Sequence, residues 1–195
     1  SYGYRPKRSG QQAIEKVKEY AEEGYRYAVS VDLSKYFDTL NHELLMNLLH
    51  RKIQDMRVLR IIKKYLKSGV MENGVVSKTE EGSPQGGPLS PLLANIYLNE
   101  FDWEMCGRGV KMVRYADDIV VFAKSKRAAE RLLEFSRKYL EGKLKLKMNT
   151  EKSKVTSIFA VKEFKFLGFC IGKNGSGIYI RAHRKSLNKA KEKLK

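Results

Sequence analysis

The spacing of apolar residues along the chain predicts an alternation of short strands and longer helices. Short runs rich in β-branched residues are typical of buried strands, and they occupy residues 27–33, 111–115, 119–123, 144–148, 154–159 and 164–171. Apolar residues at helical spacing predict helices over residues 11–23, 41–52, 56–67, 89–106 and 126–140. Asn41 is the expected N-cap of the second helix. The pair Asn73-Gly74 predicts the turn of a hairpin at residues 69–81, and a last turn is predicted at residues 174–177.

The order of these elements predicts the fold class. Strand 27–33, helices, the hairpin 111–123, helix 126–140 and a further strand follow the order β-α-β-β-α-β. This is the split β-α-β pattern of ferredoxin-like sheets, so we predict an α+β fold. Because the same topology serves binding modules and enzymes alike, it predicts no function by itself.

The net charge narrows the choice of partner. The chain has 39 Lys and Arg against 22 Asp and Glu, a formal net charge of +17. A field of this sign favours a polyanionic partner, and nucleic acid is the first candidate, whereas the alternative is a cationic surface without a partner. No apolar run is long enough to predict a membrane span. The chain begins with Ser1 and not with Met, so we expect it to be a segment of a longer protein.

Cysteine and histidine usage indicates no metal site of the zinc type. Cys106 and Cys170 are too few for a four-ligand structural site, and we expect both to be reduced and buried. His42, His50 and His183 show no metal-ligand spacing, so we interpret them as structural or surface residues.

Three carboxylates are the most informative residues. Asp117 and Asp118 lie between two short apolar strands, and Asp32 ends a strand of similar composition. In a split β-α-β sheet these elements are neighbours, so the three carboxylates are expected at one edge. They would repel one another unless a cation neutralises them, and two Mg²⁺ ions held in this way catalyse phosphoryl transfer. The alternative is that Asp-Asp serves only as turn chemistry.

The wider set of motifs carries a family resemblance. In order, these are GYRPKRSGQQAI (3–14), YAVSVDLSKYFD (27–38), GSPQGGPLSPLLANIYLN (82–99), RYADDIVVFAKS (114–125), LKLKMNTEKSKV (144–155) and FKFLGF (164–169). The set closely resembles the reverse transcriptases of bacterial group II introns, also called intron-encoded maturases. The resemblance covers nearly all of the chain, in family order.

The resemblance implies a catalytic centre built on the three carboxylates. Asp32, Asp117 and Asp118 match the ligands of two Mg²⁺ ions. Lys152 matches a lysine that helps to protonate the pyrophosphate leaving group. A solvated cationic face is the alternative for Lys152, because residues 143–154 contain five lysines.

The resemblance also implies contacts to the incoming nucleotide. Phe37 matches the steric gate, an aromatic ring that leaves no room for a ribose 2′-hydroxyl, although it could be an ordinary core aromatic. The other nucleotide-binding positions are Lys35 and Tyr36, through backbone N–H groups, and Pro84, Gln85 and Gly86, in a Gly/Pro loop that could equally be an ordinary turn.

Contacts to primer and template are implied at seven further positions. Tyr115, Phe166, Leu167 and Gly168 match residues near the primer end, and Arg5, Lys7 and Arg8 are expected to face template or phosphate. For the three basic residues, contact with solvent alone is the alternative.

The resemblance divides the chain into parts of a polymerase. Residues 1–26 are expected to be partial helical fingers, 27–68 palm with the first catalytic strand, and 69–88 the hairpin and nucleotide-contacting loop. Residues 89–180 are expected to be palm with the YADD and primer-grip hairpins, and 181–195 the start of a linker to a thumb outside the chain.

The function implied is an RNA-directed DNA polymerase that copies intron RNA into DNA and assists splicing. The partners implied are group II intron RNA, a DNA primer and deoxynucleotides, in a ribonucleoprotein of the bacterial cytoplasm. The alternative is an RNA-binding splicing cofactor in which polymerisation is secondary. A third possibility is a retron or diversity-generating enzyme. Apolar surface left by a missing thumb could also drive homodimer formation.

Overall fold

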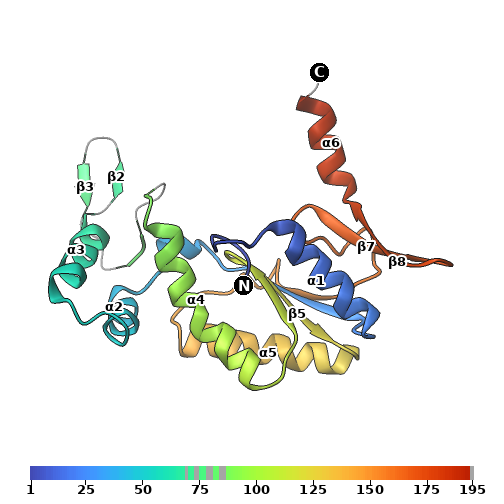
Figure 1. Ribbon diagram of the computed structural model, residues 1–195, viewed down its shortest axis with the longest axis horizontal. Coiled ribbons are helices and arrows are strands. Elements are labelled where there is room, and N and C mark those ends of the chain that lie inside the picture. The colour runs from blue at the N-terminus through green and yellow to red at the C-terminus, as the bar shows by residue number, and fades with distance from the viewer. Residues whose placement is uncertain (69, 73–74, 78–80, 84–86, 194–195) are drawn as a thin grey trace. The chain divides into compact units, whose positions relative to one another are not determined.

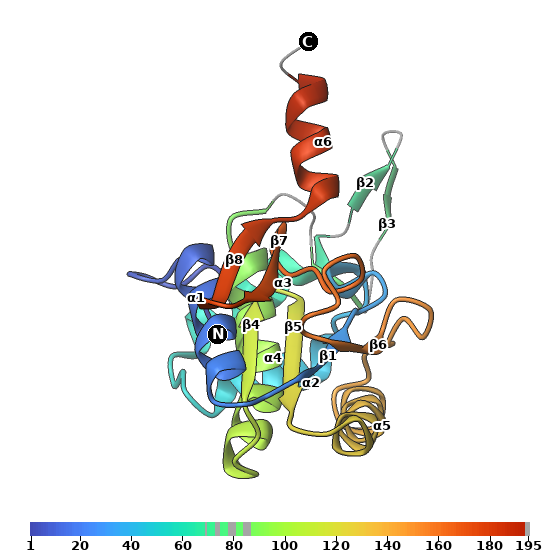
Figure 2. The ribbon, with the colours of Figure 1, turned by 90° about the vertical axis from the view of Figure 1, so that its right-hand side faces the viewer.

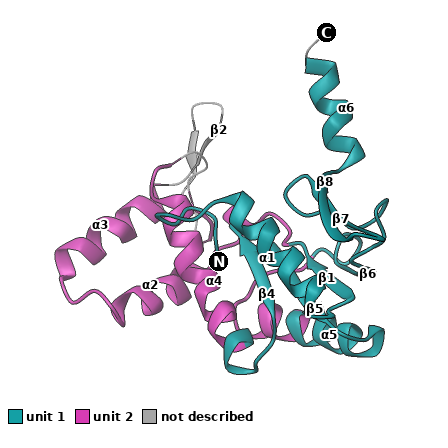
Figure 3. Ribbon diagram, turned by 45° about the vertical axis from the view of Figure 1, so that its right-hand side comes forward, with its two compact units in different colours: residues 1–32, 105–136, 149–195 teal, residues 33–104, 137–148 magenta. Residues whose placement is uncertain are grey.

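The computed structural model describes residues 1–195 except 69, 73–74, 78–80, 84–86 and 194–195 (Figure 1). The chain forms two compact units (Figure 3). Unit 1 contains residues 1–32, 105–136 and 149–195, and unit 2 contains residues 33–104 and 137–148. No helix among the described residues is long and apolar enough to cross a membrane.

Unit 1 is built on a four-stranded antiparallel sheet in the order β4-β5-β1-β6 (Figure 2). The strands are β1 (Tyr27–Val31), β4 (Met112–Tyr115), β5 (Asp118–Ala123) and β6 (Lys154–Ser157). Strand β1 therefore lies between β6 and β5, and β5 pairs with β4 in a hairpin. This is the strand order of a ferredoxin-like sheet, so the predicted α+β fold is confirmed.

One face of the sheet is covered by α1 (Gly10–Glu22). Ser9 caps this helix in a capping box with Gln12, which satisfies backbone N–H groups at its first turn. Apolar residues of α1, such as Ile14 and Val17, share one buried cluster with Val120 and other residues of the sheet. Burial of this apolar surface is the main force that holds the sheet and the helix together.

The C-terminal part of unit 1 differs from the predicted strand at residues 164–171. Its hairpin consists of β7 (Phe169–Asn174) and β8 (Gly177–Ala182), and α6 (Arg184–Lys193) follows. The strand begins only at Phe169 because Leu167 and Gly168 both have positive φ angles, 49° and 84°, and form a turn. The predicted last turn is confirmed between β7 and β8, whereas β8 itself was not predicted.

Unit 2 is mainly helical. Its elements are the 3₁₀ turn η1 (Tyr36–Asp38), α2 (His42–His50), α3 (Met56–Lys67), the hairpin of β2 (Val70–Glu72) and β3 (Val75–Ser77), and most of α4 (Ser90–Gly107). Helix α5 (Lys126–Gly142) runs from unit 1 into unit 2. Asn41 caps α2 by accepting a hydrogen bond from the Leu44 N–H, as predicted. The predicted Asn73-Gly74 turn lies outside the described residues.

Two expectations about unit 2 and the cysteines are wrong. Residues 144–148 form no strand beyond one bridge between Leu33 and Met148, because Lys145 has a φ of 56°, which breaks an extended chain. Cys106 is exposed, whereas Cys170 is buried as expected, and both are free thiols.

Candidate active site

The end of β1 and the β4–β5 turn bring Asp32, Asp117 and Asp118 together in unit 1. Val31 pairs with Ile119 across the two central strands, so Asp32 follows one member of this pair and Asp118 precedes the other. Asp117 lies in the turn that joins β4 to β5. We call these three residues the carboxylate corner.

The electrostatics of the corner agree with this placement. The pKa of the Asp118 carboxyl is raised above its ordinary value, first by desolvation and then by the negative charges of Asp117 and Asp32. Lys165 acts in the opposite direction. Asp118 is nevertheless exposed to solvent on one side. The corner is therefore a set of mutually repelling carboxylates that remains open to a cation from solvent.

Hydrogen bonds from residues 149–153 fix the backbone of Asp32. The Asp32 N–H donates to Ser153 Oγ at 3.0 Å, and the Ser153 hydroxyl donates back to the Asp32 carbonyl at 3.3 Å. The Asn149 N–H also donates to that carbonyl at 2.9 Å. Ser153 is buried, with 6% of its surface exposed. Reasoning from the sequence did not identify Ser153, although it lies within the LKLKMNTEKSKV motif.

The turn that carries Asp117 is supported by a hydrogen bond from Arg114 and by close packing of Gly3. Ala116 has a φ of 56°, which is costly for an L-residue. The buried Arg114 donates from Nη1 to the Ala116 carbonyl at 2.8 Å. A Cβ atom added to Gly3 would lie 2.5 Å from the Ala116 nitrogen, so only glycine allows the N-terminal segment to approach this closely.

The Leu167-Gly168 turn is also close to Tyr115. A Cβ atom at Gly10 would lie 3.5 Å from Leu167 Cδ1 and 3.7 Å from Tyr115 Cε2, so both side chains lie next to Gly10. Phe166 and Phe169 exchange backbone hydrogen bonds of 2.9 Å across the turn. Phe166 is buried, whereas Leu167 and Gly168 are partly exposed. The structure therefore places Leu167, at the partly exposed tip of this turn, and Tyr115 on the same side of Gly10.

The basic residues predicted to contact substrate are exposed to solvent. Lys152 is exposed, and its backbone N–H donates to Asn149 Oδ1 at 3.2 Å. Lys165, which was not predicted, is the lysine whose charge acts on Asp118. Arg5, Lys7 and Arg8 are exposed on the N-terminal segment. Arg5 donates to Ser1 Oγ at 2.7 Å, and Arg8 lies over the Tyr2 ring.

The predicted nucleotide-binding residues belong to unit 2. Tyr36 is buried and its hydroxyl donates to the Ala94 carbonyl at 2.5 Å, so its ring is a core element. Lys35 is exposed, with a φ of 47°, and its carbonyl accepts from the Asp38 N–H. Phe37 is partly exposed, and its carbonyl accepts from the Ser83 N–H at 2.7 Å. Pro84, Gln85 and Gly86 lie outside the described residues.

Among the described residues, no three His, Cys, Asp or Glu side chains form a ready-made ligand set for a metal ion. A metal at the carboxylate corner would therefore need further ligands from solvent or substrate. Mg²⁺ characteristically keeps such positions for water and phosphate oxygens while one or two carboxylates hold it. The donor set of the corner thus fits this ion better than one that requires a closed protein shell.

Comparisons with known proteins identify the family. Residues 1–171 match the family described as reverse transcriptase (RNA-dependent DNA polymerase). Protein YkfC of Escherichia coli is 36% identical over 196 residues, covering 81% of this chain and 51% of that protein. Group II intron-encoded protein LtrA of Lactococcus lactis is 29% identical over 262 residues, covering all of this chain and 43% of LtrA.

The solved structures agree at the level of the fold. A telomerase from Candida tropicalis superimposes with a TM-score of 0.66 at 13% identity, over 89% of this chain and 39% of the telomerase chain. The present chain thus spans about half the length of YkfC and less than half of LtrA. Its relatives include a group II intron-encoded protein, as the sequence motifs predicted. The chain belongs to the reverse transcriptase family.

Proposed function

We propose that the protein is an RNA-directed DNA polymerase of the group II intron type. Reverse transcriptases use divalent metal ions and bind an RNA template with a primer. The observation that carries the proposal is the carboxylate corner, where the end of β1 and the β4–β5 turn bring the three carboxylates together. Desolvation and then the charges of Asp117 and Asp32 raise the pKa of Asp118 there. Such repulsion disfavours the folded state unless a cation relieves it, and is therefore typical of a functional site.

In this proposal the carboxylate corner holds two Mg²⁺ ions. When bound, these ions supply a site that activates the primer 3′-hydroxyl and stabilises the leaving pyrophosphate. The carboxylates of Asp32, Asp117 and Asp118 anchor them. The exposed lysines Lys152 and Lys165 are the candidates to protonate or screen the pyrophosphate, and Lys165 is favoured because its charge already reaches Asp118.

The incoming deoxynucleotide is assigned to residues of unit 2. Phe37 acts as the steric gate that excludes a ribose 2′-hydroxyl. The backbone at Lys35 and Tyr36 binds the triphosphate, since the Tyr36 side chain is committed to Ala94. Pro84, Gln85 and Gly86 contact the nucleotide and the template. Support comes from the segment that leads into this loop, because Ser83 is hydrogen-bonded to Phe37.

Primer and template contacts are assigned to unit 1. The exposed tip of the Leu167-Gly168 turn, supported by the buried Phe166, and the neighbouring Tyr115 position the primer end. Arg5, Lys7 and Arg8 contact template phosphates, since all three are exposed on a segment that packs against the β4–β5 turn.

The whole protein is proposed to act with its own intron RNA. It would copy that RNA from a DNA primer and stabilise the folded RNA for splicing, as a ribonucleoprotein in a bacterial cytoplasm. The net charge of +17 and the similarity to group II intron-encoded protein LtrA favour this assignment. An RNA-binding splicing cofactor without polymerase activity is the second candidate, and the same two observations would suit it.

Primer extension by the wild type separates these two candidates, and one substitution tests the metal assignment. Asp117→Asn should abolish primer extension on an RNA template with Mg²⁺, because it removes a charge from the metal-binding set. RNA affinity should stay within a few-fold of the wild type. Glu130→Gln is the matched control, since it removes one exposed carboxylate from α5. Equal extension by Asp117→Asn and wild type would refute the metal assignment, and no extension by the wild type would favour the splicing cofactor.

A further inference from the structure

Helix α3 in unit 2 presents a strongly cationic surface that the proposed catalytic function does not use. Residues 51–67 contain seven Lys or Arg and one Asp. Leu59, Ile62 and Leu66 form the buried side of the helix. The outer side carries Arg60, Lys63, Lys64 and Lys67, which we call the cationic face.

Nearby ion pairs of the described residues involve other basic residues than those of the cationic face. Arg51 pairs with Glu100, and Arg57 pairs with Asp55 at the helix N-cap. No ion pair is found for the four residues of the cationic face within the described part of the chain. Ile61 lies between them and is 64% exposed. Basic side chains interleaved with an exposed apolar residue suit the phosphates and the sugars or bases of a nucleic acid strand.

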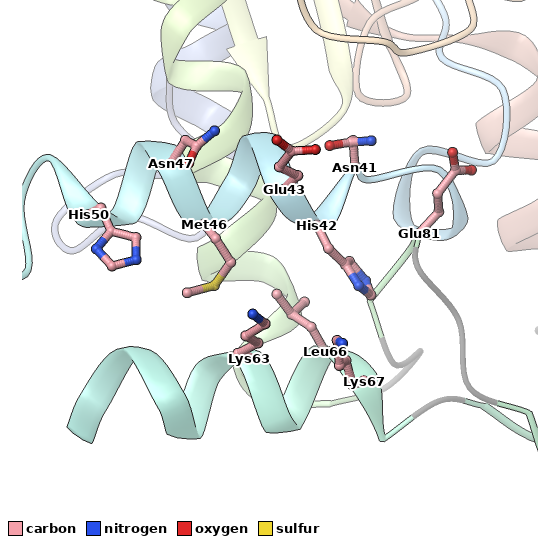
Figure 4. A pocket seen from close by; sticks show the side chains of 10 residues that line it. All are labelled: Asn41, His42, Glu43, Met46, Asn47, His50, Lys63, Leu66, Lys67 and Glu81. Atoms are coloured by element: carbon pink, nitrogen blue, oxygen red, sulfur yellow. The ribbon is translucent and has the colours of Figure 1, made fainter. Parts of the chain in front are cut away.

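A pocket of about 450 Å³ lies between α2 and α3, next to the cationic face. Lys63 and Lys67 line both the pocket and the surface depression formed by the cationic face. Figure 4 shows Met46 of α2 pointing toward α3 across this space. The volume is within the range of about 300–1,000 Å³ that takes small organic groups.

The lining of the pocket differs between its two sides. Lysines lie on its α3 side, whereas His42 and Met46 point into it from α2. Glu43 and Glu81 border the pocket, and Figure 4 shows their carboxylates directed away from α3. A nucleotide matches this division, because its phosphate is anionic and its base has a flat face that packs against neighbouring side chains. The lining therefore favours a nucleotide over a bare polyanion.

We propose that the cationic face and the adjoining pocket bind an unpaired stretch of RNA, with phosphates on Lys63 and Lys67 and one base between α2 and α3. Unpaired bases can be splayed out and read individually, whereas bases in an A-form duplex are stacked and difficult to reach. The inference rests on the proposed function only in that this function supplies an RNA partner. All residues of the site belong to unit 2, and none of them belongs to the carboxylate corner.

The test measures binding of a labelled single-stranded oligoriboadenylate as a function of salt, without Mg²⁺ or nucleotides. Lys63→Gln/Lys67→Gln should weaken binding and reduce the slope of log affinity against log salt by about 1.4, because each phosphate contact on a single strand contributes about 0.7. Arg127→Gln/Arg131→Gln is the matched control, since it removes the same charge at the same spacing from exposed positions of α5. It should leave the slope unchanged.

A second arm tests the pocket separately from the charge. Met46→Trp fills the space between the helices without changing the charge. It should keep the salt slope but lose the preference of the wild type for oligoriboadenylate over an abasic oligonucleotide of equal length. Asn47→Trp, at an exposed position that also lines the pocket, replaces it if the melting temperature of Met46→Trp falls.

The outcomes that overturn the inference are distinct. An equal salt slope in Lys63→Gln/Lys67→Gln and its control would exclude phosphate contacts on α3. Base preference that is absent from the wild type, or retained in both tryptophan variants, would exclude the pocket. If Lys63→Gln/Lys67→Gln loses binding to anionic lipid vesicles but keeps its binding to the oligoriboadenylate, the cationic face is a membrane contact. If the wild type binds as described but extends no primer, only the proposed polymerase function fails.

Discussion

The carboxylate corner and the cationic face place charge on the molecule in opposite ways. At the corner, Asp32, Asp117 and Asp118 carry like charges at one sheet edge, and the pKa of Asp118 is raised, first by desolvation and then by the charges of Asp117 and Asp32. On the cationic face, Arg60, Lys63, Lys64 and Lys67 are spread along one exposed helix without ion pairs among the described residues. The corner is electrostatically costly, whereas solvent screens the charges of the helix.

The difference extends to the backbone that supports each region. Asp32 is held through both its N–H and its carbonyl, and the β4–β5 turn is held by Arg114 and by close packing of Gly3. No hydrogen bond among the described residues holds the long side chains of the cationic face in this way. Chemistry at a metal centre depends on positions fixed to a fraction of an ångström, whereas phosphate contacts tolerate movement. Disturbing the support should therefore be damaging at the corner and mild on α3.

The largest effect is expected from Gly3→Val. A Cβ atom at this position would lie 2.5 Å from the Ala116 nitrogen, so either the N-terminal segment or the turn carrying Asp117 must move. A displacement of about 1 Å can lower a rate by about 100-fold, and we expect a loss of this order in primer extension. The melting temperature should stay well above the assay temperature, so that the loss of rate does not come from unfolding.

The control for this prediction is Gly142→Ala. No atom lies within 4 Å of a Cβ added at Gly142, which is the last residue of α5, so extension should be unaffected. Retention of full activity by Gly3→Val would show that the N-terminal segment does not position the turn.

The next largest effect is expected from Ser153→Ala. The substitution leaves the Asp32 N–H without its acceptor and removes one donor to the Asp32 carbonyl. A buried group left unpaired in this way costs about 1–3 kcal/mol. We expect primer extension to fall about tenfold, since 1.4 kcal/mol corresponds to a factor of ten.

The readout for Ser153 should separate position from general stability. If Ser153 positions Asp32, the alanine variant should require more Mg²⁺ for half-maximal extension. Ser153→Thr keeps the hydroxyl and should restore much of the activity. A variant that melts earlier but has an unchanged Mg²⁺ requirement would assign Ser153 a structural role alone.

The sequence predicted those parts of the site that depend on strand order. The apolar runs around Asp32 and Asp117 predicted neighbouring strands, and the structure pairs Val31 with Ile119 across them. The helix α3 was also predicted with its observed limits, because its apolar residues recur at helical spacing, and the structure adds Asp55 as its N-cap. Local pattern was sufficient in both cases.

The sequence did not predict the parts that depend on contacts between distant segments. Ser153 bonds to a residue 121 positions away, and Gly3 packs against Ala116. The charge of Lys165 likewise acts on Asp118 from a distant segment of the chain. Positive φ angles at Lys145 and Leu167 also ended predicted strands, although neither residue type favours that conformation.

A moderate effect is expected from Phe37→Ala in unit 2. Phe37 is partly exposed, and its ring lies 5.4 Å from that of the buried Tyr36. If it is the steric gate, its removal should raise ribonucleotide incorporation relative to deoxynucleotide incorporation several-fold. Single-nucleotide incorporation with matched deoxy- and ribonucleotides measures this ratio. Tyr65→Phe is a suitable control, because it removes only a hydroxyl bonded to Ser90. Unchanged sugar discrimination in Phe37→Ala would remove Phe37 from the site.

The smallest effect is expected from Asp118→Asn on stability without metal. The folded-state pKa of Asp118 is raised, first by desolvation and then by Asp117 and Asp32. Its stabilising contribution is therefore complete below the unfolded-state pKa and is lost as pH rises through the folded-state pKa. Asparagine never ionises, so the variant should melt slightly above the wild type at neutral pH, and the difference should disappear in acid.

With Mg²⁺ present, the wild type should melt above Asp118→Asn. The ion stabilises the wild type by binding its ionised carboxylates, and it has fewer ligands in the variant. Melting curves at several pH values, with and without Mg²⁺, measure both effects. Glu130→Gln, at an exposed position on α5, should show neither the pH dependence nor the loss of Mg²⁺ stabilisation. Parallel pH profiles for Asp118→Asn and wild type would mean that the corner carries no electrostatic cost for the ion to relieve.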